Sequence, residues 1–78
     1  METLKKALDI EQIDYRVDYA DGEFLTILTF DYYIDIFVSD IDNKYVCSTY
    51  KQIGDDRKNE RSIKSIKAVL NYIYKFHK

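Results

Sequence analysis

The chain has 78 residues, with 46% apolar and 33% charged side chains and a formal net charge of −2. That balance is typical of a folded globular chain, and the length is enough for one domain, residues 1–78. It has no proline, two glycines and no apolar run of the roughly 18 residues that a membrane span requires, so the composition excludes a long flexible linker and a membrane-spanning segment.

The first predicted element is a short helix that ends near Ile10. Leu4, Ala7 and Leu8 recur at helical spacing, and Thr3 can serve as the N-cap. Because this stretch, METLKKALDI, lacks the apolar core of a signal peptide, we expect a cytoplasmic protein.

An alternating strand, IDYRVDYADGEF, follows and is interrupted by Asp21-Gly22, the dipeptide favoured in type I′ hairpins. If these two residues form the loop, Tyr19 pairs with Phe24 and Val17 with Thr26. This register places eight residues on one face of the hairpin, which we predict to face the core: Ile13, Tyr15, Val17, Tyr19, Phe24, Thr26, Leu28 and Phe30.

A third strand is predicted at about residues 33–39. A three-residue loop at 31–33 brings Ile34, Ile36 and Val38 to the core face. A two-residue loop would bring Asp35 inside, and a buried unpaired carboxylate is costly. The outer face then exposes an apolar patch rimmed by carboxylates, which consists of Leu25, Ile27 and Phe37. Such a patch is typical of a partner surface, while cover by another segment, or a homodimer through this face or an edge strand, stays open.

The stretch YVCSTY is predicted as a fourth strand, and a helix is predicted from about Glu60 to the end, capped by Asn59 or Asp56. Six apolar residues of this helix fall on one arc: Ile63, Ile66, Val69, Leu70, Ile73 and Phe76. The order α-β-β-β-β-α predicts a two-layer α+β domain, with an antiparallel sheet of three to four strands, a short N-terminal helix and a long C-terminal helix.

Charge is unevenly distributed along the chain. Residues 7–43 contain ten acidic residues and one base, a net charge of −9, whereas residues 44–78 contain nine bases and three acidic residues. Aspartates at turns account for about half of the ten, because Asp bonds to its own backbone there. Asp14, Asp18 and Asp35 lie instead in predicted strands, against their β-propensity. A strongly negative surface steers basic partners, so we expect the acidic half to contact a basic protein.

Side chains of common catalytic and metal sites are scarce. Cys47 is the only cysteine, which excludes an internal disulfide and a cysteine-based zinc site, and His77 is the only histidine. A Cys47–His77 pair would lack an orienting third group. The DIDN stretch lacks the glycine and the terminal glutamate of a calcium loop, and there is no glycine-rich phosphate loop. We therefore expect a protein that is not an enzyme and that binds no metal or cofactor.

The strand segments IDYRV (13–17) and NKYVCS (43–48), with the size and layout of the chain, resemble small phage-encoded inhibitors, including anti-CRISPR proteins. The resemblance implies an inhibitor in the host cytoplasm that acts as a DNA mimic and covers the basic nucleic-acid-binding site of a defence nuclease. The basic C-terminal segment departs from mimics that are acidic throughout. Carried over to this sequence, the acidic contacts and the apolar anchors are Asp14, Asp18, Asp21, Glu23, Tyr33, Asp35, Phe37, Asp40 and Asp42.

The alternative is a small nucleic-acid-binding domain. The order helix–strands–helix and the base-rich stretch GDDRKNERSIKSIKAVLNYI resemble the double-stranded-RNA-binding domain, whose final helix presents lysines to phosphates. Asp55 and Asp56 depart from that pattern, because they and an acidic sheet would repel phosphate. The resemblance implies nucleic-acid contacts from Arg57, Lys58, Arg61, Lys64, Lys67 and Lys75.

Overall fold

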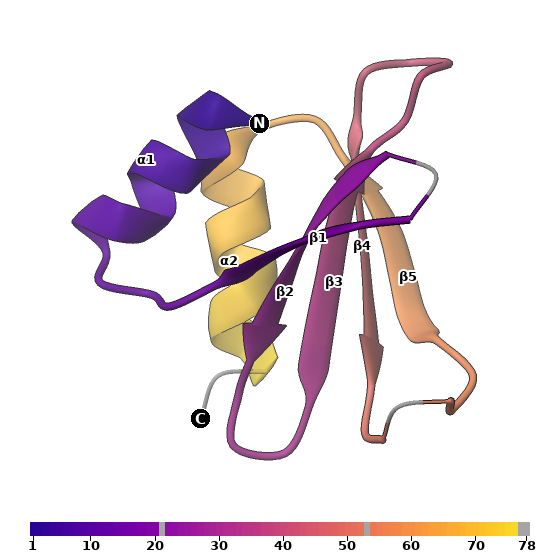
Figure 1. Ribbon diagram of the computed structural model, residues 1–78. Coiled ribbons are helices and arrows are strands. Elements are labelled where there is room, and N and C mark those ends of the chain that lie inside the picture. Colours follow the sequence, from indigo (N-terminus) through magenta and orange to yellow (C-terminus); the bar gives the residue numbers. More distant parts are fainter. Residues whose placement is uncertain (21, 53, 77–78) are drawn as a thin grey trace.

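Two helices and five strands make up the computed structural model, which describes residues 1–20, 22–52 and 54–76. In chain order they are α1 (Glu2–Ile10), β1 (Arg16–Tyr19), β2 (Glu23–Leu28), β3 (Tyr33–Val38), β4 (Tyr45–Tyr50), β5 (Lys58–Ile63) and α2 (Ile66–Phe76). Each strand pairs antiparallel with the next, so the sheet order is β1-β2-β3-β4-β5. Both helices pack on the same face of the sheet (Figure 1). The predicted two-layer α+β fold is confirmed, with five strands instead of three to four.

Helix α1 covers the sheet with Leu4 and Leu8, which lie one turn apart and are fully buried. The predicted end of the helix near Ile10 is confirmed. The predicted N-cap at Thr3 is wrong, because the helix already begins at Glu2. The apolar spacing therefore identified the helix correctly, but not its first turn.

The end of α1 has the two hydrogen bonds of a Schellman motif. The Ile13 N–H donates to the Leu8 carbonyl at 2.9 Å, and the Gln12 N–H donates to the Asp9 carbonyl at 3.1 Å. Gln12 takes the left-handed conformation, with φ of 58°. This turn directs the chain from the helix toward the sheet, and Ile13 joins the core.

The β1–β2 hairpin has a register one residue away from the predicted one. Tyr19 pairs with Glu23 rather than with Phe24, so residues 20–22 connect the two strands. The predicted Asp21-Gly22 loop includes Asp21, which lies outside the described residues. Because side chains alternate between the faces of a sheet, a shift by one residue exchanges the two faces of β2.

The observed register decides which residues of β2 fill the core. Leu25 and Ile27 belong to the core and are 0% exposed, so the predicted surface patch of Leu25, Ile27 and Phe37 is wrong. Leu28, predicted in the core, is exposed. Thr26 also lies on the face opposite the helices. The hydrophobic effect favours this arrangement, because two aliphatic side chains leave water beneath the helices.

The β2–β3 turn is tighter than the sequence predicts. Leu28 pairs with Tyr33, and the Thr29 N–H donates to the Tyr32 carbonyl at 2.8 Å. Only residues 30 and 31 therefore form the loop, and the predicted three-residue loop at 31–33 is wrong. Ile34 and Ile36 are buried in the core, as predicted, whereas Val38, also predicted there, is half-buried outside it. The two strands thus form a regular hairpin in which β3 contributes its aliphatic side chains to the helix-covered face.

The predicted fourth strand is confirmed as β4, and a fifth strand follows it where the sequence predicts the start of the last helix. Lys58–Ile63 pair with β4, for example through Ile63 opposite Tyr45. Five of the six residues of β5 are exposed, so the strand has no apolar alternation. Its place in the sheet depends on backbone hydrogen bonds to β4, which hydrophobic periodicity cannot reveal.

Helix α2 begins at Ile66, not near Glu60. The Ala68 N–H donates to Ser65 Oγ at 3.2 Å, so Ser65 caps the helix and the predicted caps Asn59 and Asp56 are wrong. The helix buries three side chains against the sheet, Val69, Tyr72 and Ile73. Neither α1 nor α2, the helices of the described ranges, is long and apolar enough to cross a bilayer.

Candidate protein-binding surface

Two turns and the start of α1 meet at one end of the molecule, which we call the acidic end. The β1–β2 connection and the β3–β4 turn lie together there because the sheet is an antiparallel meander (Figure 1). The acidic end consists of Asp18, Glu23, Phe37, Asp40, Ile41 and Asp42. The sequence predicts all of these as binding residues except Ile41.

A cavity of about 560 Å³ opens at the acidic end. Met1 lines it from the start of the chain, Glu23 from β2, Phe37 from β3, and Asp40 and Ile41 from the β3–β4 turn. Its volume lies in the range of pockets that hold small ligands or side chains. The cavity therefore combines apolar walls with two carboxylates.

The β3–β4 turn presents Ile41 to solvent. This side chain is 96% exposed between Asp40 and Asp42. The Ser39 N–H donates to the Lys44 carbonyl at 2.9 Å, and the Ile41 N–H donates to Ser39 Oγ at 3.3 Å, so hydrogen bonds hold the turn. An aliphatic residue inside an otherwise polar turn is the signal that the sequence interpretation missed.

Two carboxylates of the acidic end form ion pairs within the chain. Lys5 Nζ lies 3.1 Å from Glu23 Oε2, and this hydrogen bond is the largest cause of the raised pKa of Lys5. Arg16 Nε lies 2.8 Å from Asp18 Oδ2, and this contact raises the pKa of Arg16. Asp40 forms no ion pair with any described residue. Among the described residues of the acidic end, the carboxylates without an ion pair are therefore Asp40 and Asp42, both on the β3–β4 turn.

Asp35 lies on the sheet face opposite the helices, as predicted, but it is only 3% exposed. Its carboxylate accepts hydrogen bonds from Thr26 Oγ1 at 3.0 Å, from the Tyr50 hydroxyl at 3.2 Å and from the Arg57 guanidinium. Burial and the charge of Asp35 raise the pKa of Tyr50. The sequence argument against a buried Asp35 assumed an unpaired carboxylate, whereas three donors from two strands and a loop satisfy it.

Two further residues of the predicted contact set, Tyr33 and Asp14, do not join the acidic end. Tyr33 lies at the opposite end of β3 and stacks on Tyr50, with ring centroids 5.1 Å apart. Asp14 is exposed in the connection between α1 and β1. Asp21 lies outside the described residues. The structure thus gathers five of the nine predicted residues and places Asp14, Tyr33 and Asp35 apart from them.

The bases of the alternative interpretation are spread over β5, α2 and the loops beside them. Arg57 binds Asp35 and lies over the Tyr50 ring at 5.0 Å, while Lys75 Nζ lies 5.8 Å from the centre of the Phe76 ring. The four remaining bases are exposed and form no ion pair within the described residues: Lys58, Arg61, Lys64 and Lys67. The β5 side of the molecule is therefore basic, although Arg61 lies on β5 with Lys58 and not on the last helix as predicted.

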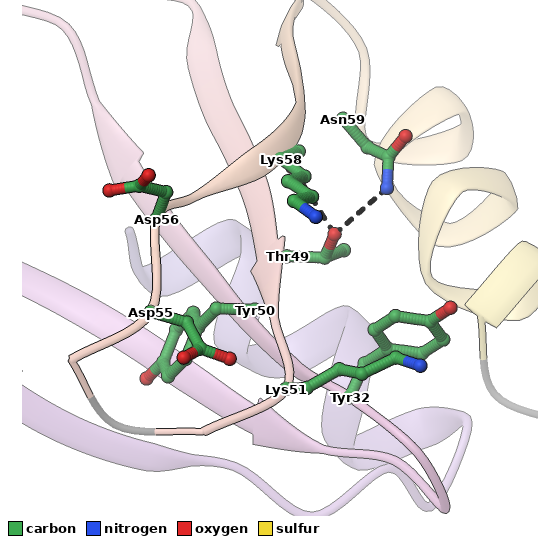
Figure 2. A pocket seen from close by; sticks show the side chains of 8 residues that line it. All are labelled: Tyr32, Thr49, Tyr50, Lys51, Asp55, Asp56, Lys58 and Asn59. Carbon is green, nitrogen blue, oxygen red and sulfur yellow. Dashed lines mark hydrogen bonds between the residues drawn. The ribbon is translucent and has the colours of Figure 1, made fainter.

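A second cavity, of about 530 Å³, lies beside the β4–β5 connection (Figure 2). Acids and bases line it together: Tyr32, Thr49, Tyr50, Lys51, Asp55, Asp56, Lys58 and Asn59. Asn59 Nδ2 donates to Thr49 Oγ1 at 3.0 Å, and the Lys51 ammonium lies 5.5 Å from the centre of the Tyr32 ring. Several of its polar groups are thus engaged with one another, and its charges are mixed.

Catalytic chemistry at Cys47 is disfavoured. The residue is fully buried, and burial raises the pKa of its thiol to about 12, which suppresses the thiolate. His77, the other member of the pair considered from sequence, lies outside the described residues. Within residues 1–20, 22–52 and 54–76, no three His, Cys, Asp or Glu side chains are grouped so that they could hold a metal ion. That the protein is not an enzyme stays a prediction.

No protein-family model, curated protein or solved structure matches this chain. The resemblances to anti-CRISPR inhibitors and to the double-stranded-RNA-binding domain therefore stay predictions. The shape and the charge of the surface are the basis on which a function can be inferred.

Proposed function

We propose that this chain is a non-enzymatic protein-binding domain whose acidic end docks on a basic surface of another protein. The observation that carries the proposal is Ile41, an almost completely exposed aliphatic side chain between two aspartates on a hydrogen-bonded turn. Binding interfaces combine apolar anchors with a polar rim that excludes water. The acidic end has both parts, because Asp40 and Asp42 flank the anchor.

The β3–β4 turn is ordered by its own hydrogen bonds. The Lys44 N–H donates to Asp42 Oδ1 at 3.2 Å, and the Asn43 N–H donates to the Ser39 carbonyl at 3.0 Å. A loop that is already fixed loses little conformational entropy when it binds. This favours the turn as the primary contact over a loop that would first have to fold.

Charge gives the surface its preference for a basic partner. Asp40 and Asp42 are exposed, and Phe37, which is 43% exposed, adds apolar area beside them. Such charges accelerate association with a positive surface, and salt screens them over a distance of about 8 Å at physiological ionic strength. In its more specific form the proposal is an inhibitor that covers the basic nucleic-acid-binding site of a defence nuclease. The resemblance to phage-encoded anti-CRISPR inhibitors supports this form.

Capture of a partner with matched variants tests the proposal. The tagged chain, an Asp40→Asn/Asp42→Asn variant and an Asp9→Asn/Asp31→Asn control are each incubated with host lysate after nuclease treatment. We expect the parent and the control to retain one protein in equal amounts. The Asp40→Asn/Asp42→Asn variant should bind this protein at least about tenfold more weakly, a loss of about 1.4 kcal/mol of binding free energy. Equal retention by the two variants would contradict the proposal.

The retained protein then tests the specific form. It is purified with its nucleic-acid ligand, and the parent chain is added in increasing amounts. Release of the nucleic acid, without release by the Asp40→Asn/Asp42→Asn variant, is the expected result. A ternary complex in which the nucleic acid stays bound would exclude an inhibitor of this type.

The unpaired bases favour nucleic-acid binding as a second candidate function. Four bases are exposed on the β5 side and form no ion pair within the described residues: Lys58, Arg61, Lys64 and Lys67. Binding through them should weaken steeply with salt, and Lys64→Gln, Lys67→Gln and Lys75→Gln together should weaken binding and flatten that dependence. Capture that disappears after nuclease treatment would favour this candidate, and binding of nucleic acid without salt dependence would exclude it.

A further inference from the structure

The cavity at the acidic end has the chemistry of a receptor for one basic side chain. We propose that it takes an arginine side chain of the partner, while Ile41 enters an apolar depression beside that arginine. The inference rests on the proposed function and deepens it, because it names the partner residue that the surface recognises.

The apolar part of the cavity suits the stem of an arginine. Met1, Phe37, Val38 and Ile41 line it. Long basic side chains bury their methylene groups along apolar surface and keep the charged head at a polar rim. The Phe37 ring also offers a face on which a guanidinium can lie, a contact that strengthens as water is excluded.

The polar part of the cavity supplies acceptors from two separate elements. Glu23 comes from β2 and Asp40 from the β3–β4 turn, and both line the cavity. Glu23 Oε2 already holds the ammonium of Lys5 at 3.1 Å, so this carboxylate is oriented to receive a cation. Within the described residues, Glu23 Oε1 and both oxygens of Asp40 accept no side-chain hydrogen bond. A guanidinium has five donors in a planar fork, which can serve acceptors on two walls at once.

Lys5 is the positive charge that competes with the incoming arginine. Its ammonium is bonded to Glu23 and also to Glu2, at 3.2 Å. Replacement of Lys5 by methionine keeps the length of the side chain and removes its charge. If the cavity is an arginine receptor, Lys5→Met should strengthen arginine binding, whereas a mutation that only damaged the fold would weaken it.

Titration of the ¹⁵N-labelled full chain with short peptides, followed by NMR, tests the inference. The probes are acetyl-Gly-Arg-Gly-amide, the same peptide with citrulline, which has the shape of arginine without its charge, and the same peptide with lysine. We expect millimolar binding of the arginine peptide, with shift changes confined to the amides of Gly22, Glu23, Phe37, Asp40 and Ile41. The citrulline peptide should bind up to about fivefold more weakly, the limit for an exposed ion pair.

Variants assign the effect to the cavity. Asp40→Asn should weaken binding of the arginine peptide as much as the replacement of arginine by citrulline does, and Lys5→Met should tighten it. Asp9→Asn, in the last turn of α1, should leave the affinity unchanged. Equal binding of the arginine and citrulline peptides would overturn the inference. So would shift changes of equal size at Asp9 and Asp31, or no shift change at all. Equal binding of the lysine peptide would overturn the assignment to arginine.

The peptide test and the partner capture fail independently. If no arginine peptide binds but capture depends on Asp40 and Asp42, the acidic end docks in another way and the inference falls alone. If the arginine peptide binds and no captured protein depends on these residues, the cavity recognises arginine but the proposed function falls.

Discussion

The burial of Asp35 on the face of the sheet opposite the helices can be tested by removing its charge. In Asp35→Asn the side chain keeps its shape, and its amide oxygen can still accept from Thr26 and from the Tyr50 hydroxyl, as the carboxylate does at 3.0 and 3.2 Å. The amide nitrogen, however, replaces the oxygen that accepts from Arg57. Two donors then face each other at a buried position.

The expected cost follows from these contacts. Leaving a buried donor unsatisfied costs about 1–3 kcal/mol. Because the Arg57 side chain is 53% exposed, its ion pair with Asp35 adds no more than about 1 kcal/mol. We therefore expect Asp35→Asn to lower the free energy of unfolding by about 2–3 kcal/mol, a large part of the 4–12 kcal/mol or so typical of a domain of this length. At about 4–8 °C per kcal/mol, the melting temperature should fall by at least about 8 °C.

Urea unfolding followed by circular dichroism measures this cost, with Asp31→Asn as the control at an exposed turn position. The control should stay within about 0.5 kcal/mol of the parent. Arg57→Gln alone should cost about 1 kcal/mol, because Asp35 keeps its two hydroxyl donors. If Asp35→Asn is as stable as the control, the carboxylate is not buried among donors and the reasoning fails.

Three further predictions concern stability. Ser65→Ala should lower the free energy of unfolding by about 1 kcal/mol, because it removes the cap of α2. The control Ser62→Ala, on β5, should change the free energy of unfolding by less than about 0.5 kcal/mol. Equal effects of the two mutations in urea unfolding would contradict the observed start of α2. Gln12→Gly should raise the free energy of unfolding by up to about 1 kcal/mol, because glycine adopts a φ of 58° without the steric penalty of a Cβ atom. A lower urea midpoint for this variant would argue against the Schellman turn. Burial raises the pKa of the Cys47 thiol from 9.0, and that of the Tyr72 hydroxyl from 10.0, to about 12 in each case. Because the folded protein holds both groups in their neutral, protonated form, the free energy of unfolding is unaffected by them below about pH 9 and falls between about pH 9 and 12. Tyr72→Phe removes one of the two groups, so the urea midpoint should fall less steeply above about pH 10.

The candidate surface shows how far residue types predict a site. The acidic half of the chain is visible in the sequence. In the structure, Glu23, Phe37 and Asp40 line one cavity, and Asp42 follows on the same turn as Asp40. Which carboxylates remain free is not visible, because Lys5 reaches Glu23 from a helix eighteen residues earlier. Ion pairing of this kind depends on how α1 is placed on the sheet.

The sequence by itself determined the elements with a strong local signal. Leu4 and Leu8 place α1, and the alternation around Ile34 and Ile36 places β3 and its buried face. Charge segregation along the chain and the lack of a common catalytic constellation are also properties of the sequence alone. These features depend on spacing and composition, which need no knowledge of distant neighbours.

Only the tertiary structure decided the register of β2, the existence of β5 and the burial of Asp35. β2 has large apolar residues on both faces, so its pattern fits either register, and the packing of the helices on Leu25 and Ile27 selects one. β5 has no apolar alternation, and it becomes a strand because the exposed edge of β4 offers backbone hydrogen bonds. Asp35 can be buried because Arg57, 22 residues later in the chain, returns across the sheet to meet it. Each outcome depends on groups that are remote in sequence and become neighbours when the chain folds.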